Sequence, residues 1–157
     1  MKYNIFCFLL FIVCSSALAN TPNTLISIHA VELNNKDKPV QRTYIERATY
    51  RLINEKTHKI TLITQKSKAK AIYLEPGQYC FKSLERINIR NPACFNVLDN
   101  AISNAGTWLI GYRSFSDNDR THRYALLVDH KDNYSELESI LEVKNSVPVI
   151  ANNLPPK

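Results

Sequence analysis

The stretch TWLIGYRSF, residues 107–115, carries the strongest β-strand pattern in this sequence. Trp108, Ile110 and Tyr112 occupy alternate positions, so an extended chain places these three large side chains on one side. Aromatic and β-branched residues are also the types that pack best on a pleated surface. The stretch therefore predicts a strand that is buried on at least one face.

A second stretch of the same kind follows at Arg123–Asp129, where Tyr124, Leu126 and Val128 alternate. The charged and polar segment Asp117–Thr121 lies between the two stretches. We expect two strands joined by a charged loop.

Shorter segments with a strand pattern occur in the part of the chain before residue 100. The segment Thr43–Ile53 favours a strand, although a helical stripe through Ile45, Ala48 and Leu52 is the alternative. The polar turn Asn54–Lys59 predicts a hairpin with the segment that follows it. The remaining expected strands are Leu25–Val31, Ile60–Thr64, Ala71–Leu74, Gln78–Leu84 and Cys94–Leu98.

One short helix is expected near the C-terminus, at Glu136–Glu142. Ser135 and Glu138 have the spacing of a capping box, and the inward-facing residues would be Leu137, Ile140 and Leu141. Seven or eight short strands with turns about every ten residues predict an all-β sandwich or barrel with this helix appended. The 157 residues, 45% of them apolar, suit one domain and argue against a multidomain enzyme.

The first nineteen residues predict a signal peptide. Lys2 precedes the apolar run Ile5–Val13, and the small residues of Ala17–Ala19 suit cleavage before Asn20. We therefore divide the chain into a signal peptide 1–19, a β-sandwich domain 20–145 and an extended tail 146–157. No later run is long and apolar enough to span a bilayer, so we expect a soluble periplasmic or extracellular protein without a transmembrane segment in its mature chain.

Four cysteines are present, and two of them, Cys7 and Cys14, fall inside the leader. Export removes the chain from the reducing cytosol, so Cys80 and Cys94 are expected to form a disulfide closing a fifteen-residue loop. The alternatives are a pair of metal-binding thiolates, which lacks the usual close spacing, and a lipid anchor on Cys14.

The positive charge is concentrated in the first half of the mature chain. Residues 20–79 contain ten basic and five acidic side chains, whereas residues 80–157 contain nine of each. In an extended chain Lys66, Lys68 and Lys70 project from one side. The candidate strip for an anionic ligand consists of Lys56, Lys59, Lys66, Lys68 and Lys70. The alternative is that these lysines protect a sheet edge from aggregation. Nucleic acid is an unlikely partner because no aromatic residues interleave with the lysines.

No metal site, cofactor or catalytic motif is predicted. The histidines His29, His58, His122 and His130 lack a metal-binding spacing and are expected to be structural. Asp117 and Asp119 lack the glycine and distal glutamate of a calcium loop, so we expect a solvated turn. There is no Gly-x-Ser-x-Gly elbow, and a catalytic function would require a pocket with converging polar groups. Trp108 and the eight tyrosines are expected to serve packing; lining a glycan or peptide site is the alternative.

The clearest turn is Glu75–Gln78, where Pro76 presets its φ and Gly77 supplies a positive φ. The surrounding sequence, Tyr73–Tyr79, resembles the Leu-x-Pro-Gly-x-Tyr turn of prealbumin-like sandwiches, including carboxypeptidase-regulatory-like modules and collagen-adhesin B-type repeats. The resemblance implies that Pro76 and Gly77 form a turn between two strands, that Tyr79 packs in or near the core, and that the protein is an accessory or structural module.

These observations favour a non-enzymatic exported binding or accessory module of the cell envelope, which contacts an anionic envelope polymer or a protein partner. The alternative is an inhibitor of an extracytoplasmic hydrolase or a toxin-neutralising protein, which would insert a protruding loop such as Asp117–Thr121 into an enzyme cleft.

Overall fold

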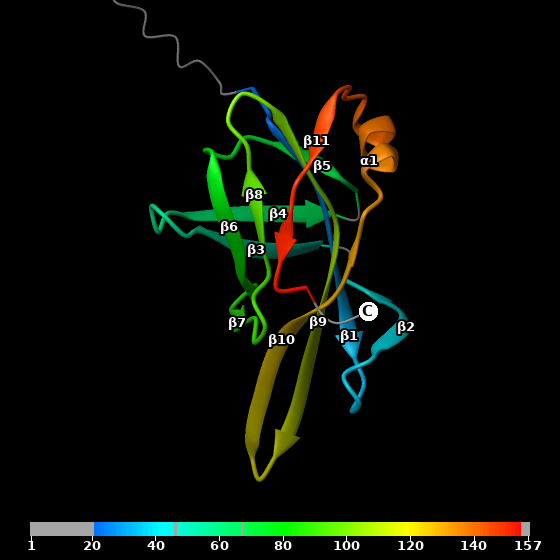
Figure 1. Ribbon diagram of the computed structural model, residues 1–157. Helices are drawn as coiled ribbons and strands as arrows, with labels where there is room; N and C mark the ends of the chain where they lie inside the picture. Colours follow the sequence, from blue (N-terminus) through cyan, green and yellow to red (C-terminus); the bar gives the residue numbers. More distant parts are fainter. Residues whose placement is uncertain (1–20, 46, 67, 155–157) are drawn as a thin grey trace, which may run out of the picture.

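The computed structural model describes residues 21–45, 47–66 and 68–154 (Figure 1). The predicted leader 1–19, with Cys7 and Cys14, lies outside the described residues. Within these ranges, no helix is both long enough and apolar enough to cross a membrane.

The described chain forms twelve strands and one helix, which confirms the all-β class with a short C-terminal helix. There are more strands than expected, and the longest two, β9 and β10, have 16 and 12 residues. The elements are β1 (Thr24–Leu33), β2 (Pro39–Tyr44), β3 (Arg47–Asn54), β4 (Ile60–Lys66), β5 (Lys70–Ile72), β6 (Gly77–Leu84), β7 (Ile87–Asn88), β8 (Cys94–Val97), β9 (Ile102–Asp117), β10 (Arg120–Lys131), α1 (Tyr134–Leu141), β11 (Ser146–Pro148) and β12 (Ala151–Asn152).

The strands form two six-stranded sheets. Sheet A has the order β10-β9-β1-β2, with β11 beside β9 and β5 beside β1; sheet B has the order β12-β8-β6-β3-β4, with β7 beside β6. β1 and β9 pair in parallel although about eighty residues separate them. Strands β3 and β4 run across the direction of β1 and β9 (Figure 1). The expected strand 43–53 is divided between β2 in sheet A and β3 in sheet B, and the helical alternative for it is wrong.

Both sheets contribute side chains to one core between them. β3 alternates buried and more exposed residues along its length, as a strand with one face on a core must. Trp108 of sheet A packs against Phe81 of sheet B with ring centroids 4.9 Å apart, and against Phe95 at 5.9 Å. Tyr50 and Tyr79 are also buried in this cluster, so these aromatic residues serve packing.

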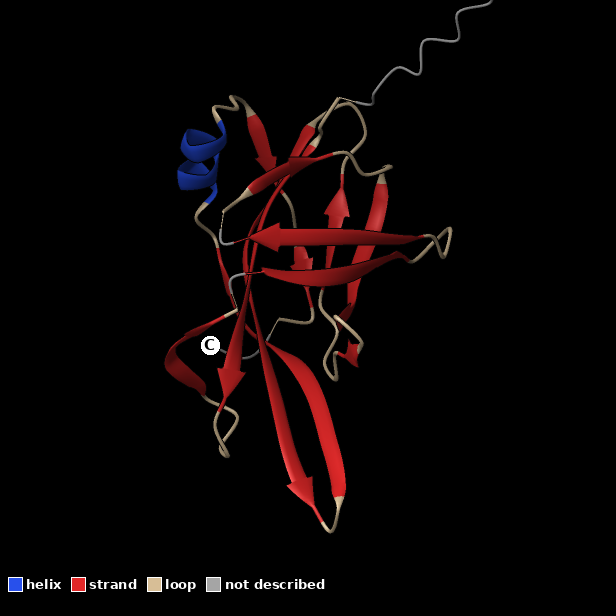
Figure 2. Cartoon of the chain, turned by 180° about the vertical axis from the view of Figure 1, so that it is seen from behind, coloured by secondary structure: helices blue, strands red, loops and turns tan. Residues whose placement is uncertain are grey.

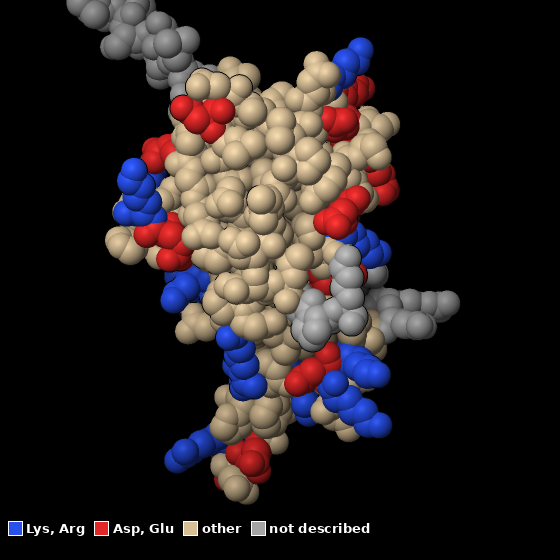
Figure 3. Space-filling model, in the orientation of Figure 1, with Lys and Arg blue, Asp and Glu red and all other residues tan. Residues whose placement is uncertain are grey.

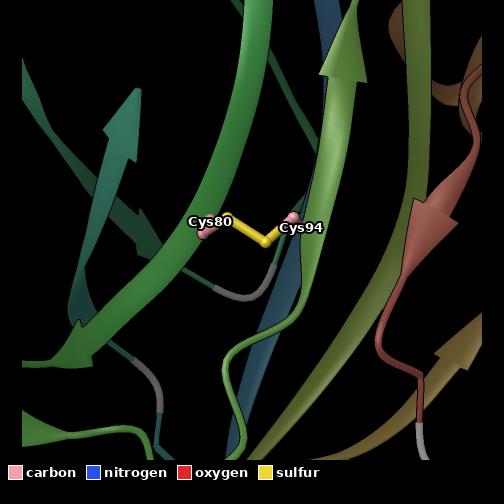
Figure 4. Close-up of a disulfide and its surroundings, with 2 residues drawn as sticks. All are labelled: Cys80 and Cys94. Atoms are coloured by element: carbon pink, nitrogen blue, oxygen red, sulfur yellow. A yellow bond between two sulfur atoms is a disulfide. The ribbon is translucent and has the colours of Figure 1, made fainter. Parts of the chain in front are cut away.

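The predicted disulfide is confirmed: Cys80 of β6 and Cys94 of β8 are bonded (Figure 4). The two residues are direct partners in the antiparallel ladder between these strands, and their Cα atoms are 4.0 Å apart. The bond therefore joins two neighbouring strands of sheet B and closes the loop that contains β7.

The turn at Pro76–Gly77 connects the two sheets. β5 pairs with β1 in sheet A and β6 lies in sheet B, so the flanking strands do not pair with each other. Gly77 has a φ of +144°, and a Cβ placed there would lie 3.0 Å from Nδ2 of Asn54. Tyr79 stacks on Phe95 in the core.

The helix differs from its expected boundaries. It begins at Tyr134 with Asn133 as its N-cap, and Ser135 lies inside the first turn. Glu138 makes no capping box, because its Oε1 accepts a hydrogen bond from the Ser146 backbone N–H at 2.6 Å. Leu137 is buried as expected, but Ile140 is 56% exposed.

The expected tail 146–157 contributes a strand to each sheet. β11 pairs in parallel with β9, and β12 pairs antiparallel with β8. Because the two strands are joined by only two residues, this segment forms a second short connection between the sheets, in addition to the Pro76–Gly77 turn.

Candidate functional site

The hairpin of β9 and β10 projects beyond both sheets (Figure 2). We call its outer part, Arg113–Tyr124, the ribbon. At its tip Asn118 and Asp119 have φ values of 45° and 63°, as both central residues of a type I′ turn require. Every residue from 114 to 123 is exposed. The predicted loop 117–121 is thus the narrow end of a two-stranded arm.

One face of the ribbon carries a stack of aromatic and cationic groups. Phe115 and His122 are cross-strand partners whose rings lie 5.1 Å apart and nearly parallel, at 19°. The guanidinium of Arg113 lies over the ring of Phe115, 4.9 Å from its centre. Tyr124 meets Phe115 edge-on at 6.4 Å. Because strand side chains repeat every two residues, these four groups share one face.

The base of the ribbon is held by contacts from other parts of the chain. Arg90 lies over the ring of Tyr124, 3.7 Å from its centre. The hydroxyl of Tyr124 donates a hydrogen bond to Asp37 in the β1–β2 turn. Arg113 forms an ion pair with Asp37 at 3.9 Å and donates to the carbonyl of Asn35. These contacts fix the direction in which the arm leaves the sheets.

The predicted lysine strip is divided into two groups. Lys56 and Lys59 belong to the β3–β4 turn, whereas Lys66 ends β4, Lys68 lies in a connection and Lys70 begins β5. The length of β4 puts about 23 Å between the groups. Lys68 and Ala69 do not belong to a strand, so the expected alternation does not apply there.

Two of these lysines are engaged within the chain. Lys59 forms an ion pair with Glu75 at 2.6 Å, and this hydrogen bond raises the pKa of Lys59. Lys70 donates to the carbonyl of Thr64. β4 is an edge of sheet B, where lysines also oppose edge-to-edge pairing. On the face in Figure 3, Lys and Arg are dispersed among Asp and Glu.

A pocket of about 770 Å³ lies on the outer face of sheet A, beside helix α1. Its lining includes Ser27, His29, Thr107 and Leu109 from β1 and β9 and the helix residue Ile140. The volume falls within the range of small-molecule sites. The pocket brings together groups that no motif in the sequence connects.

Ser27 and His29 form a hydrogen-bonded pair in this pocket, with Oγ and Nε2 3.2 Å apart. Burial, and to a smaller extent the charge of Lys131, lowers the pKa of His29 below 6.5. The imidazole is therefore neutral at neutral pH and can accept the hydroxyl proton of Ser27 in this hydrogen bond.

The other predicted polar residues are separated. His122 lies on the ribbon, whereas His130 packs against Trp108 with ring centroids 4.3 Å apart. Asp117 and Asp119 belong to the tip of the ribbon. In residues 21–45, 47–66 and 68–154, no three His, Cys, Asp or Glu side chains are grouped to hold a metal ion.

The comparisons with known proteins return no relative. No family model, curated protein or solved structure matches the chain. The molecule is defined by its architecture: two β-sheets, a cross-strand disulfide, a projecting ribbon and a pocket beside one helix.

Proposed function

We propose that this protein is an exported, non-enzymatic binding module that contacts a protein partner through the ribbon. The observation that carries the proposal is the stack of Arg113, Phe115 and His122 on an exposed two-stranded arm. Arginine and aromatic side chains are the types most enriched at the energetic centres of protein interfaces.

The geometry of the stack favours binding. Phe115 is 38% exposed, which leaves a large apolar surface available to a partner. Its ring already contacts both Arg113 and His122, so less side-chain entropy is lost on association than for a freely rotating ring. Arg120 projects from the same face as His122 and is exposed, which suits a partner with an acidic group at the rim of its binding surface.

Export is part of the proposal. The Cys80–Cys94 disulfide persists in an oxidising compartment, and the sequence of residues 1–19 predicts a leader. Both observations are consistent with a protein that functions in the periplasm or outside the cell.

A second candidate is an inhibitor of an extracytoplasmic hydrolase. The observation that favours it is the shape of the arm, whose tip narrows to the two-residue turn Asn118–Asp119 and is exposed on both strands. A narrow arm of this kind can enter an enzyme cleft. The lysines support contact with an anionic polymer less well, because they are divided and two of them are engaged.

Site-specific photo-cross-linking tests the proposal. A photoreactive amino acid replaces Ser114 or Thr121 on the ribbon, or Thr57 in the β3–β4 turn as a matched exposed control, in the full chain expressed in its native host. We expect one dominant protein adduct from both ribbon positions. Excess unlabelled protein should suppress it, whereas excess Phe115→Ala protein should compete at least about tenfold less well.

Equal adducts from the ribbon and from Thr57, or equal competition by the Phe115→Ala protein, would contradict the proposal. If the adduct contains a hydrolase, its activity should fall on addition of the intact protein and not of an Asp117→Ala/Arg120→Ala variant. Retention on an anionic polymer that salt abolishes, with no ribbon adduct, would point to the lysines.

A further inference from the structure

The pocket beside α1 has a floor built by the parallel pairing of β1 and β9. Ser27 is the ladder partner of Thr107, and His29 is the partner of Leu109. Partners in a ladder project to the same side of a sheet, and Ile26 and Ile28 of β1 point into the core on the other side. The floor thus presents the two hydroxyls, the imidazole and one apolar side chain away from the core.

The walls of the pocket are apolar. Leu137 and Ile140 of α1 and Ile45 of the β2–β3 connection surround the floor. Leu137 is 1% exposed and supports the helix on the sheet, whereas Ile140 is 56% exposed at the mouth. An apolar molecule in the pocket would remove water from Ile140, which the fold alone does not achieve.

The rim of the pocket carries an excess of positive charge. Among the lining residues that the structure describes, Lys68 and Lys131 contribute two ammonium groups and Glu136 one carboxylate, which gives these residues a net charge of +1. Glu136 accepts a hydrogen bond from the side chain of Asn133. Within the described ranges, neither Lys68 nor Lys131 forms an ion pair. The two ammonium groups are thus available to an anion.

We infer that this pocket binds a small amphipathic carboxylate, with its hydrocarbon part against Leu109 and Ile140 and its carboxylate at Lys68 and Lys131. A single negative charge neutralises the net charge of +1 on the described rim residues, whereas a dianionic phosphate would leave one charge uncompensated beside the apolar walls. The apolar walls with a few converging polar groups are the usual construction of a small-molecule site. The site uses residues of β9 outside the ribbon, so the inference is independent of the proposed function.

The Ser27–His29 pair fits this assignment. A neutral imidazole adds no charge to the floor, and its Nε2 is already hydrogen-bonded to the Ser27 hydroxyl before a ligand enters. The floor can therefore accept a hydrocarbon chain without leaving a buried charge unpaired.

Isothermal titration calorimetry with sodium octanoate and with 1-octanol tests the inference on the full chain. The two probes have the same chain length and differ in charge. We expect octanoate to bind with one-to-one stoichiometry and at least about tenfold more tightly than octanol. The affinity for octanoate should decrease as salt is added. Absence of octanoate binding, or equal affinity for the two probes, would overturn the inference.

Four variants assign the binding to this pocket. Lys131→Gln should lower the affinity for octanoate about three- to tenfold and leave the affinity for octanol unchanged, because it removes only the charge contact. Ile140→Glu should lower the affinity for both probes, and the affinity for octanoate more. The controls are Lys144→Gln and Ile150→Glu, which change exposed residues of the same types elsewhere, and neither should alter binding. Ile140 is exposed, so its variant should fold, as circular dichroism can verify. Unchanged octanoate affinity in Lys131→Gln and Ile140→Glu would place any binding elsewhere and refute the site.

Discussion

The side-chain amide of Asn91 pairs with both backbone groups of Leu127. Its Nδ2 donates to the Leu127 carbonyl at 3.2 Å, and its Oδ1 accepts from the Leu127 N–H at 2.8 Å. β10 is the edge of sheet A, and its register shifts between Leu127 and Asp129. Beside this contact, the backbone N–H of Arg90 donates to Ala125 at 2.9 Å. Residues 89–91 therefore cover an edge that would otherwise offer free backbone groups.

Replacing Asn91 with Ala should lower the free energy of unfolding by about 1–2 kcal/mol, because it removes two hydrogen bonds and exposes the edge of β10. Urea denaturation followed by circular dichroism measures the change. Asn88→Ala is the matched control, since Asn88 is an exposed asparagine of the adjacent strand β7. An equal effect from both variants would show that the amide contact does not stabilise the edge.

The disulfide should contribute about 3 kcal/mol, as expected for a cross-link that closes a fifteen-residue loop. Changing both Cys80 and Cys94 to Ser should lower the free energy of unfolding by about this amount, measured by urea denaturation. Addition of a reductant should destabilise the native protein and leave the double-serine variant unchanged. Peptide mapping without reduction should recover the two cysteines linked; free thiols in protein from an oxidising compartment would contradict the bond.

Replacing Gly77 with Ala should destabilise the protein by about 1–3 kcal/mol, because side chains disfavour its positive φ. The new Cβ would also press on Nδ2 of Asn54, which is 3.0 Å away. Pro76→Ala is the control at the preceding position and should cost less than about 1 kcal/mol. Chemical denaturation of both variants checks the prediction, which fails if Gly77→Ala is as stable as the native chain.

The buried imidazole of His29 should make stability depend on pH. Its pKa in the folded protein lies below the unfolded value near 6.5, so the unfolded chain binds more protons between these two values. The contribution of His29 to the free energy of unfolding is therefore present above pH 6.5 and is lost as the pH falls toward the folded pKa. Urea denaturation at about pH 7.5 and about pH 5.5 should show a larger loss for the native protein than for His29→Gln. Equal losses in the two proteins would show that His29 is not the group responsible.

Sequence reasoning was most successful where a short local pattern determines the secondary structure. The alternation in 107–115 predicts β9, because burying one face of a strand requires apolar residues at every second position. The turn Asn54–Lys59 between two such patterns predicts the β3–β4 hairpin. The pairing of Cys80 with Cys94 followed from counting, once the leader cysteines were set aside.

The same reasoning was less successful where a local pattern permits more than one tertiary partner. Two strands around Pro76–Gly77 look alike in sequence whether they pair with each other or enter different sheets, and here they enter different sheets. The spacing of Ser135 and Glu138 suits a capping box, yet Glu138 bonds to the more distant backbone of Ser146. Such choices depend on which non-local contact is the more favourable in the folded chain.

The primary sequence was sufficient for the secondary-structure class, because strand periodicity is a property of neighbouring residues. It was also sufficient for the disulfide, because only two cysteines remain outside the predicted leader. It did not reveal the ribbon stack or the pocket. Phe115 meets His122 only through the register of a long hairpin, and Ser27 meets Thr107 only through a parallel pairing across eighty residues. Side chains converge on a surface through the three-dimensional arrangement of strands, and that arrangement arises from burial in the shared core of the two sheets.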